Sequence, residues 1–129
     1  KDWNTVGMPA EAANAIDGDP QTVWTAKALT PLVVDMGKAS EVIGFSYAPA
    51  QKEDLTGTIY KYNFYVSIDG KNWTKCDASG EFSNIMHNPV PYFVRFGKKY
   101  PARYFKLEPA AEINNKPATT VGEVGILLK

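Results

Sequence analysis

The segment "NAIDGDPQTVW", residues 14–24, concentrates oxygen-bearing side chains near the start of the sequence. Asp17, Asp19 and Thr22 supply two carboxylates and a hydroxyl, and the glycine and proline between them interrupt any regular helix or strand. Hard cations such as Ca²⁺ are bound by about six to eight oxygens, and a bent backbone can turn its own carbonyl oxygens toward the ion. The residue types of this turn therefore suit a hard cation.

The spacing of the acids in this turn leaves two interpretations open. An EF-hand needs a carboxylate at the twelfth position of its loop, but counting from Asp17 that position is Ala28. A cation site would therefore have to be completed by residues from elsewhere in the chain. In the other interpretation, the segment is a solvated turn in which Asp17 or Asp19 accepts hydrogen bonds from nearby backbone N–H groups.

Residues that could support catalysis are sparse. His87 is the single histidine and Cys76 the single cysteine, and they lie in separate segments, so a catalytic triad or a zinc site would lack members. A glycosidase needs two carboxylates with different environments, and no pair among the fourteen acidic residues lies in such a context. The chain is also short to enclose a sugar cleft. The sequence predicts a non-catalytic domain that contains no intramolecular disulfide.

The composition favours one globular domain. The chain has 129 residues, of which 44% are hydrophobic, and its fourteen basic residues balance fourteen acidic ones. Without a basic excess, the usual electrostatic argument for nucleic-acid or anionic-membrane binding is missing. No apolar run approaches the length of a membrane span. Because the sequence starts at Lys1 rather than Met, we expect residues 1–129 to be a module excised from a larger protein.

The sequence predicts that the elements that position the oxygen-rich turn are short strands. In "YKYNFYVSIDGKNW", apolar and polar residues alternate from Tyr60 to Asp69, as in a half-buried strand, and Asp69-Gly70 supplies a hairpin turn. Other strands are predicted at residues 31–37, 42–48, 92–97, 103–108 and 123–128, and one helical turn at residues 9–17. Short strands separated by turns predict an all-β, antiparallel β-sandwich of jelly-roll type.

Seven fragments in a fixed order carry a family resemblance: "AIDGDPQTVW", "VVDMG", "GFSYAP", "YNFYVSIDGKNW", "GEFSNI", "ARYFKL" and "VGEVGIL". Together they resemble the discoidin, or coagulation factor 5/8 type C, domain, also called the family 32 carbohydrate-binding module. The closest likeness is to modules of bacterial glycosidases such as α-L-fucosidases and β-N-acetylhexosaminidases (chitobiases). The resemblance implies a galactose-binding-domain-like jelly roll that tethers a covalently linked catalytic domain to glycans. It further implies a monomeric module in a bacterial protein that is secreted, periplasmic or at the cell surface.

The resemblance also implies a structural Ca²⁺ where the first turn meets the last strand. Its ligands would be the Asn14 carbonyl, the Asp17 carboxylate, the Asp19 carbonyl, the Thr22 hydroxyl and carbonyl, the Gly122 carbonyl and the Glu123 carboxylate. Glu123 begins the apolar segment "EVGILL", where an uncompensated carboxylate would be costly. The ion would tie the two ends of the chain together.

The family's ligand face consists of loops at one end of the sandwich, which here are residues 25–28, 50–57 and 113–118. The sequence departs from the galactose-binding pattern: no histidine follows Trp24, Ala50 stands where an arginine is expected, and Thr56 stands where an asparagine is expected. Substitute sugar contacts on this face are Thr25, Lys27, Tyr47, Gln51, Lys52, Asp54, Thr56, Asn114, Asn115 and Lys116. Among these, Tyr47 is the aromatic candidate.

An alternative interpretation keeps the fold but assigns it another role. The module would pack against its catalytic domain or another protein, sugar binding having been lost, through an apolar patch that includes Trp3 or the region of Tyr92, Phe93 and Phe96. Membrane binding is disfavoured, because the loop "APAQKEDLTGT" is polar and the net charge is zero.

Overall fold

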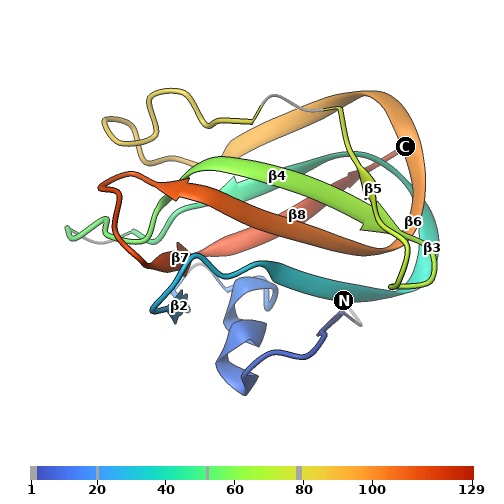
Figure 1. Cartoon of the computed structure of the whole chain (residues 1–129), viewed down its shortest axis with the longest axis horizontal. Coiled ribbons are helices and arrows are strands. Elements are labelled where there is room, and N and C mark those ends of the chain that lie inside the picture. The colour runs from blue at the N-terminus through green and yellow to red at the C-terminus, as the bar shows by residue number, and fades with distance from the viewer. Residues whose placement is uncertain (1–2, 20, 52, 78–79) are drawn as a thin grey trace.

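The computed structural model describes residues 3–19, 21–51, 53–77 and 80–129, which form eight strands and a short 3-10 helix. Lys52, one of the predicted ligand contacts, lies outside the described residues. Figure 1 shows the arrangement of the elements, which are β1 (Asn4–Thr5), η1 (Ala10–Ala15), β2 (Trp24–Ala26), β3 (Leu32–Ala48), β4 (Ile59–Ser67), β5 (Thr74–Lys75), β6 (Tyr92–Glu112), β7 (Thr119–Val121) and β8 (Glu123–Leu128).

Two long strands, β3 and β6, run through both layers of the fold. They pair with each other in antiparallel register and curve together around one edge of the molecule (Figure 1). The first half of β3 and the second half of β6 share a layer with β1, β4 and β5, whereas the second half of β3 pairs with β8 and the first half of β6. The sheet therefore folds over into an antiparallel sandwich, which confirms the predicted fold class.

The continuity of β3 and β6 corrects the predicted strand boundaries. Residues 31–37 and 42–48 were expected to be separate strands, and so were 92–97 and 103–108. The structure instead joins each pair, because β3 shifts register between Asp35 and Ser40 and bends there while its pairing with β6 resumes beyond the irregularity. A bulge of this kind turns a strand without ending it.

Aromatic rings fill the space between the two layers. Phe45 of β3 stacks on Phe64 of β4, with ring centroids 4.1 Å apart and planes 8° from parallel. Phe82, from the loop after β5, stacks on Tyr62 at 4.5 Å and on Tyr47 at 5.0 Å. Such pairs add about 0.5–1.5 kcal/mol each beyond the burial of their area. The alternation predicted for β4 is confirmed at its centre, where Tyr62 and Phe64 are buried.

Of the rings that the alternative interpretation places in an apolar patch, Phe93 is exposed, Trp3 and Tyr92 are half-buried, and Phe96 is buried. Phe93 is 69% exposed, but Phe96 is only 8% exposed and packs against Tyr100 in the core. Trp3 is half-buried and lies edge-on against Phe105, with ring centroids 5.6 Å apart. The expectation of an exposed Phe96 is therefore wrong, because the ring faces the interior of the bent β6.

The helical turn predicted at residues 9–17 is the 3-10 helix η1. It begins after Pro9, and its Ala12 and Ala15 are fully buried against the sandwich. Among the described residues, no helix has the length and apolar character that crossing a membrane requires. The turn that follows η1 leads into β2 and carries the oxygen-rich segment.

Candidate functional site

The oxygen-rich turn gathers its acceptors around one hydroxyl. The Thr22 hydroxyl donates to Asp17 Oδ2 at 2.6 Å, and it also lies 3.1 Å from the carbonyl oxygen of Asp19 and 3.4 Å from that of Asn14. One hydroxyl proton can serve only one of these acceptors well, and backbone N–H groups bind two oxygens of the turn: Thr22 N–H donates to the Asp19 carbonyl at 3.3 Å, and Asp19 N–H donates to Asp17 Oδ1 at 2.9 Å. An arrangement of converging oxygens is what a hard cation requires.

The last strand reaches this turn. The backbone N–H of Gly18 donates to Glu123 Oε2 at 3.0 Å, across 105 residues of sequence. Burial raises the pKa of the nearby Asp17 carboxyl, but hydrogen bonds from the Thr22 hydroxyl and from backbone N–H groups outweigh burial, so the pKa is lowered overall. These hydrogen bonds, together with one from the Glu123 side chain, therefore favour the ionised form of Asp17.

Gly122 and Asp19 take part in this region through their backbones. Gly122 is buried, its N–H donates to the Ala48 carbonyl at 2.9 Å, and a Cβ there would lie 2.9 Å from the carbonyl oxygens of Ala48 and Pro49. The side chain of Asp19 has a partner of its own, because its Oδ1 accepts the N–H of Gln21 at 2.9 Å. This agrees with the implied use of the Asp19 carbonyl rather than its carboxylate.

The donor set of the turn can be tested for its fit to Ca²⁺. In the described part of the chain, no three His, Cys, Asp or Glu side chains gather closely enough to hold a metal ion by themselves. A cation here would be bound by the carboxylates of Asp17 and Glu123, the Thr22 hydroxyl and backbone carbonyls. An all-oxygen set with few charges fits Ca²⁺ and not a transition metal.

The three predicted ligand loops meet at one end of the sandwich, at the left in Figure 1. Two of these loops, 50–57 and 113–118, meet at Glu112, the last residue of β6, which is only 2% exposed. Its Oε2 accepts the N–H of Gly57 at 2.7 Å, and its Oε1 accepts the N–H groups of Asn114 at 2.7 Å and Lys116 at 2.8 Å. One buried carboxylate thus holds loop 50–57 against loop 113–118.

Strand β7 joins the third loop to the other two. The Thr119 hydroxyl donates to the Ala28 carbonyl at 2.7 Å, and the Thr120 N–H donates to the Gly57 carbonyl at 2.8 Å. Gly57 has a φ of +96°, and a Cβ at that position would collide with the Thr120 side chain, so only glycine allows this approach. Loops 25–28, 50–57 and 113–118 are therefore fixed relative to one another.

Sequence reasoning missed Glu112, Thr119 and Thr120. The sequence offered one indication of Glu112: it follows the apolar residues Pro109-Ala110-Ala111 at the end of a strand, where burying a carboxylate is costly unless it is hydrogen-bonded. The three N–H donors that satisfy it come from residues up to 55 positions away, and no pattern in the sequence identifies them.

The predicted ligand residues differ in where the structure places them. Asn115 and Lys116 line a hollow of about 490 Å³ together with Leu29, Ala110, Ala111, Glu112 and Pro117. The exposed residues around this end also include Thr25, Lys27, Asp54 and Asn114, while Thr56 is half-buried. Gln51 is exposed but is tied to another loop, because its Nε2 donates to the carbonyls of Pro49 and Pro89 at 3.1 Å each.

Tyr47 is the clear error among the ligand candidates. It is fully buried, its hydroxyl donates to the Thr120 carbonyl at 2.7 Å, and it accepts the N–H of Ile59 at 3.0 Å. Burial raises the pKa of the Tyr47 hydroxyl far above its usual value, and the hydrogen bond from Ile59 offsets only part of that rise. Its ring shares the inward face of β3 with Phe45, so it cannot stack on a sugar.

Replacing Tyr47 with phenylalanine is expected to lower the free energy of unfolding by about 1–2 kcal/mol, because a buried carbonyl and a buried N–H lose their shared partner. Urea denaturation measures this change. Tyr92→Phe is the control, since the Tyr92 hydroxyl donates to the Asn88 carbonyl at an exposed position, and we expect it to change stability by less than about 0.5 kcal/mol. Equal effects of the two substitutions would contradict the structural role given to the Tyr47 hydroxyl.

Comparisons with known proteins agree with this architecture. The F5/8 type C domain family matches residues 2–124. A galactose oxidase from Gibberella zeae is 30% identical over 124 residues, which cover 90% of this chain and 18% of that protein. A sialidase from Micromonospora viridifaciens is 26% identical over 130 residues, covering 95% of this chain and 19% of the sialidase. The chain thus spans about a fifth of the length of these curated relatives.

Solved structures show the same fold. The third family 32 carbohydrate-binding module of a family 31 glycoside hydrolase from Clostridium perfringens superposes with a TM-score of 0.84 at 19% identity, covering 98% of this chain and 91% of that one. A candidate α-L-fucosidase from Bacteroides ovatus is 36% identical with a TM-score of 0.71, covering 90% of this chain and 20% of that one. Because the family matches residues 2–124, which is almost the whole chain, this chain belongs to the F5/8 type C domain family.

Proposed function

We propose that this chain is a non-catalytic carbohydrate-binding module, that it tethers a covalently linked bacterial glycosidase to glycans, and that one Ca²⁺ stabilises it. Several structural relatives are described by their sugars: a module from Clostridium perfringens in complex with galactose, another from that organism with GalNAc-β-1,3-galactose, and one with 4,5-unsaturated mannuronic acid. These relatives support the class of function and leave the sugar bound by this chain to be identified.

The observation that carries the proposal is that Glu112 and strand β7 together hold the three loops against one another. Because the loop backbones are held by hydrogen bonds, the exposed side chains project from fixed backbone positions, which lowers the cost of ordering the loops on binding. Asn115 can donate and accept hydrogen bonds with sugar hydroxyls, and Lys116 can donate. Leu29, which is 40% exposed, offers apolar surface to the C–H face of a sugar in a hollow that lacks an aromatic ring.

Tethering explains why a weak site of this kind would be useful. A module that holds its enzyme near a polymer raises the effective concentration of substrate, so even millimolar affinity helps the linked catalytic domain. We place such a protein outside the bacterial cytoplasm, either secreted, periplasmic or at the cell surface, where polysaccharides are encountered, and we expect the module to act as a monomer.

Calorimetric titration with galactose-, GlcNAc- and fucose-terminated oligosaccharides tests the proposal. We expect one class to bind, and we expect Asn115→Gly and Lys116→Ala each to weaken its binding by about 5- to 10-fold. Glycine suits the left-handed backbone of Asn115, whose φ is +57°. Lys71→Ala, an exposed lysine in the β4–β5 turn at the opposite end of β4, is the control. Flat heats with every glycan, from protein that unfolds cooperatively, would refute sugar binding.

Exposure of Phe93 favours a second candidate function, in which the module packs against another domain. Phe93 pairs with Ser46 of β3, and Ser46 pairs with Gly125 of β8, so the ring stands beside small residues on the outer face of one layer. This function predicts that Phe93→Ser lowers the melting temperature of the parent enzyme while leaving that of the isolated module unchanged. If both temperatures are unchanged, this packing surface is excluded.

A further inference from the structure

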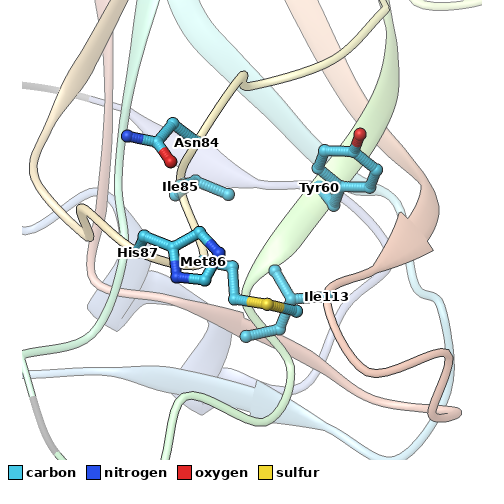
Figure 2. Close-up of a pocket in the computed structure, with 6 residues that line it drawn as sticks. All are labelled: Tyr60, Asn84, Ile85, Met86, His87 and Ile113. Carbon is cyan, nitrogen blue, oxygen red and sulfur yellow. The ribbon is translucent and has the colours of Figure 1, made fainter.

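A second hollow lies next to the proposed sugar-binding loops. Its volume is about 390 Å³, and Figure 2 shows the six residues that line it: Tyr60, Asn84, Ile85, Met86, His87 and Ile113. Ile113 directly follows Glu112, which lines the first hollow, so consecutive residues at the end of β6 border the two cavities. The second hollow therefore opens beside loop 113–118.

One wall of this hollow is a tight turn that displays two side chains. Asn84 adopts a left-handed backbone with a φ of +66°, and its carbonyl accepts the N–H groups of His87 at 3.1 Å and Asn88 at 2.9 Å. Ile85 is fully buried and anchors the turn to the core, whereas Met86 is 43% exposed. The turn thus holds Met86 and His87 at the surface, and Figure 2 shows the Met86 side chain between His87 and Ile113.

The opposite wall is built by the start of β4. The half-buried Tyr60 is fixed by its hydroxyl, which donates to Glu81 Oε2 at 3.2 Å. Ile113 is held against this strand because its N–H donates to the carbonyl of Thr58 at 3.1 Å. Both walls are therefore anchored by hydrogen bonds to backbone or to a neighbouring side chain, as in a largely preformed site.

The residues that line the hollow suit an uncharged amphipathic ligand. None of the six lining residues is Lys, Arg, Asp or Glu, and the two charged side chains beside Tyr60, Glu81 and Lys61, have opposite signs, so this wall favours neither an anionic nor a cationic ligand. Ile85, Met86 and Ile113 supply apolar surface, and Asn84, His87 and Tyr60 carry hydrogen-bonding groups. A pyranose ring presents the same combination, with C–H groups on its faces and hydroxyls around its edge.

We propose that this hollow is a second subsite, which receives an uncharged sugar unit of the glycan whose terminal unit occupies the first hollow. The inference rests on the proposed function and extends it: the full ligand is an oligosaccharide long enough to cross loop 113–118, and a single sugar fills the first hollow only. Two weak contacts on one chain reinforce each other, because the second is made at a high effective concentration once the first has formed.

Nuclear magnetic resonance can detect occupancy of the second hollow directly. His87 is the single histidine of the chain, and Met86 is one of three methionines, so their ring and methyl signals are readily assigned. We expect lacto-N-neotetraose or chitotriose to shift the signals of His87 and Met86 together with the backbone amides of Asn115 and Lys116. Galactose or GlcNAc alone should shift only the amides. The methyl groups of Met8 and Met36 are internal controls, since Met36 is buried and Met8 packs against the core.

Substitutions in the second hollow provide an independent readout. Met86→Ala and His87→Ala should each weaken binding of the oligosaccharide by about 3- to 5-fold and leave the affinity for the monosaccharide unchanged. Ile68→Ala is the matched control, because Ile68 is 53% exposed and lies just beyond the far end of β4. These changes at exposed positions should leave the unfolding temperature almost unaltered, which thermal denaturation checks.

The outcomes separate the two proposals. If the loop amides shift with every oligosaccharide while His87 and Met86 remain unchanged, the second subsite is refuted and the proposed function stands. If no glycan shifts either set of signals, both are refuted. If trigalacturonate shifts His87 and Met86 as strongly as the uncharged sugars do, the selectivity for an uncharged unit is refuted. Joint shifts with the uncharged oligosaccharides support the subsite.

Discussion

Glu112→Gln is expected to lower the free energy of unfolding by about 3 kcal/mol and the melting temperature by about 10 °C. The carboxylate is buried and accepts three backbone N–H groups, from Gly57, Asn114 and Lys116. A glutamine side chain has the same shape but only one acceptor oxygen. Whichever way its amide turns, an NH₂ group then faces a backbone N–H, and at least one buried donor loses its partner.

The matched control for this substitution is Glu108→Gln on the same strand. Glu108 is half-buried, and its Oε1 accepts from the side chains of Asn63 at 3.1 Å and Tyr65 at 3.4 Å, which can turn to other partners or to water. We expect it to cost less than about 1 kcal/mol. Thermal and urea denaturation of both variants measure the difference, and similar losses of stability would show that Glu112 has no special role.

Glu112→Gln is also expected to weaken glycan binding at temperatures where the variant remains folded. The carboxylate positions loops 50–57 and 113–118 without itself being needed for a sugar contact, so its loss should loosen both loops. Amide hydrogen exchange at Gly57, Asn114 and Lys116 reports this loosening, and faster exchange should accompany the weaker binding. Weaker binding with unchanged exchange would contradict a positioning role.

Removing divalent cations is the second change with a large expected effect. A ligand that binds only the folded state stabilises it by about 2.7 kcal/mol at a hundred times its dissociation constant. If the turn and the last strand share a Ca²⁺, a chelator should lower the melting temperature by about 8 °C, and Ca²⁺ should restore it. Mg²⁺ should restore it less well, because Mg²⁺ prefers a stricter octahedral geometry and retains its water.

Substitutions at the proposed Ca²⁺ ligands distinguish this site from adventitious binding. Asp17→Asn and Glu123→Gln should abolish the response to Ca²⁺, because each removes a charged ligand. Asp19→Asn is the control, since the Asp19 side chain accepts the N–H of Gln21 through an oxygen that asparagine keeps, and the backbone carbonyl is unaffected. A melting temperature that ignores the chelator, or an Asp17→Asn variant that still responds to Ca²⁺, would refute the cation.

The sequence by itself determined the features that depend on neighbouring residues. The alternation around Tyr62 and Phe64 predicted a half-buried strand, because side chains on consecutive strand residues point to opposite faces. The Ala-rich segment predicted the short helical turn at η1. The order of the family-like fragments predicted the sandwich and the approach of the first turn to Glu123, which the hydrogen bond from Gly18 shows. In each case the prediction depended on a few consecutive residues or on the order of the family-like fragments along the chain.

The tertiary structure alone decided what depends on residues brought together from distant segments. The two halves of β3 form one strand, because pairing with β6 resumes beyond the bulge at which β3 bends. Tyr47 faces inward because the packing of both layers, not its place beside a loop, sets its environment. Glu112 joins loops that are separated by up to 55 residues, and the second hollow joins Tyr60 to Met86 and Ile113. Local patterns specify which way a side chain points along its own strand, whereas its partners exist only after the sheet has folded over.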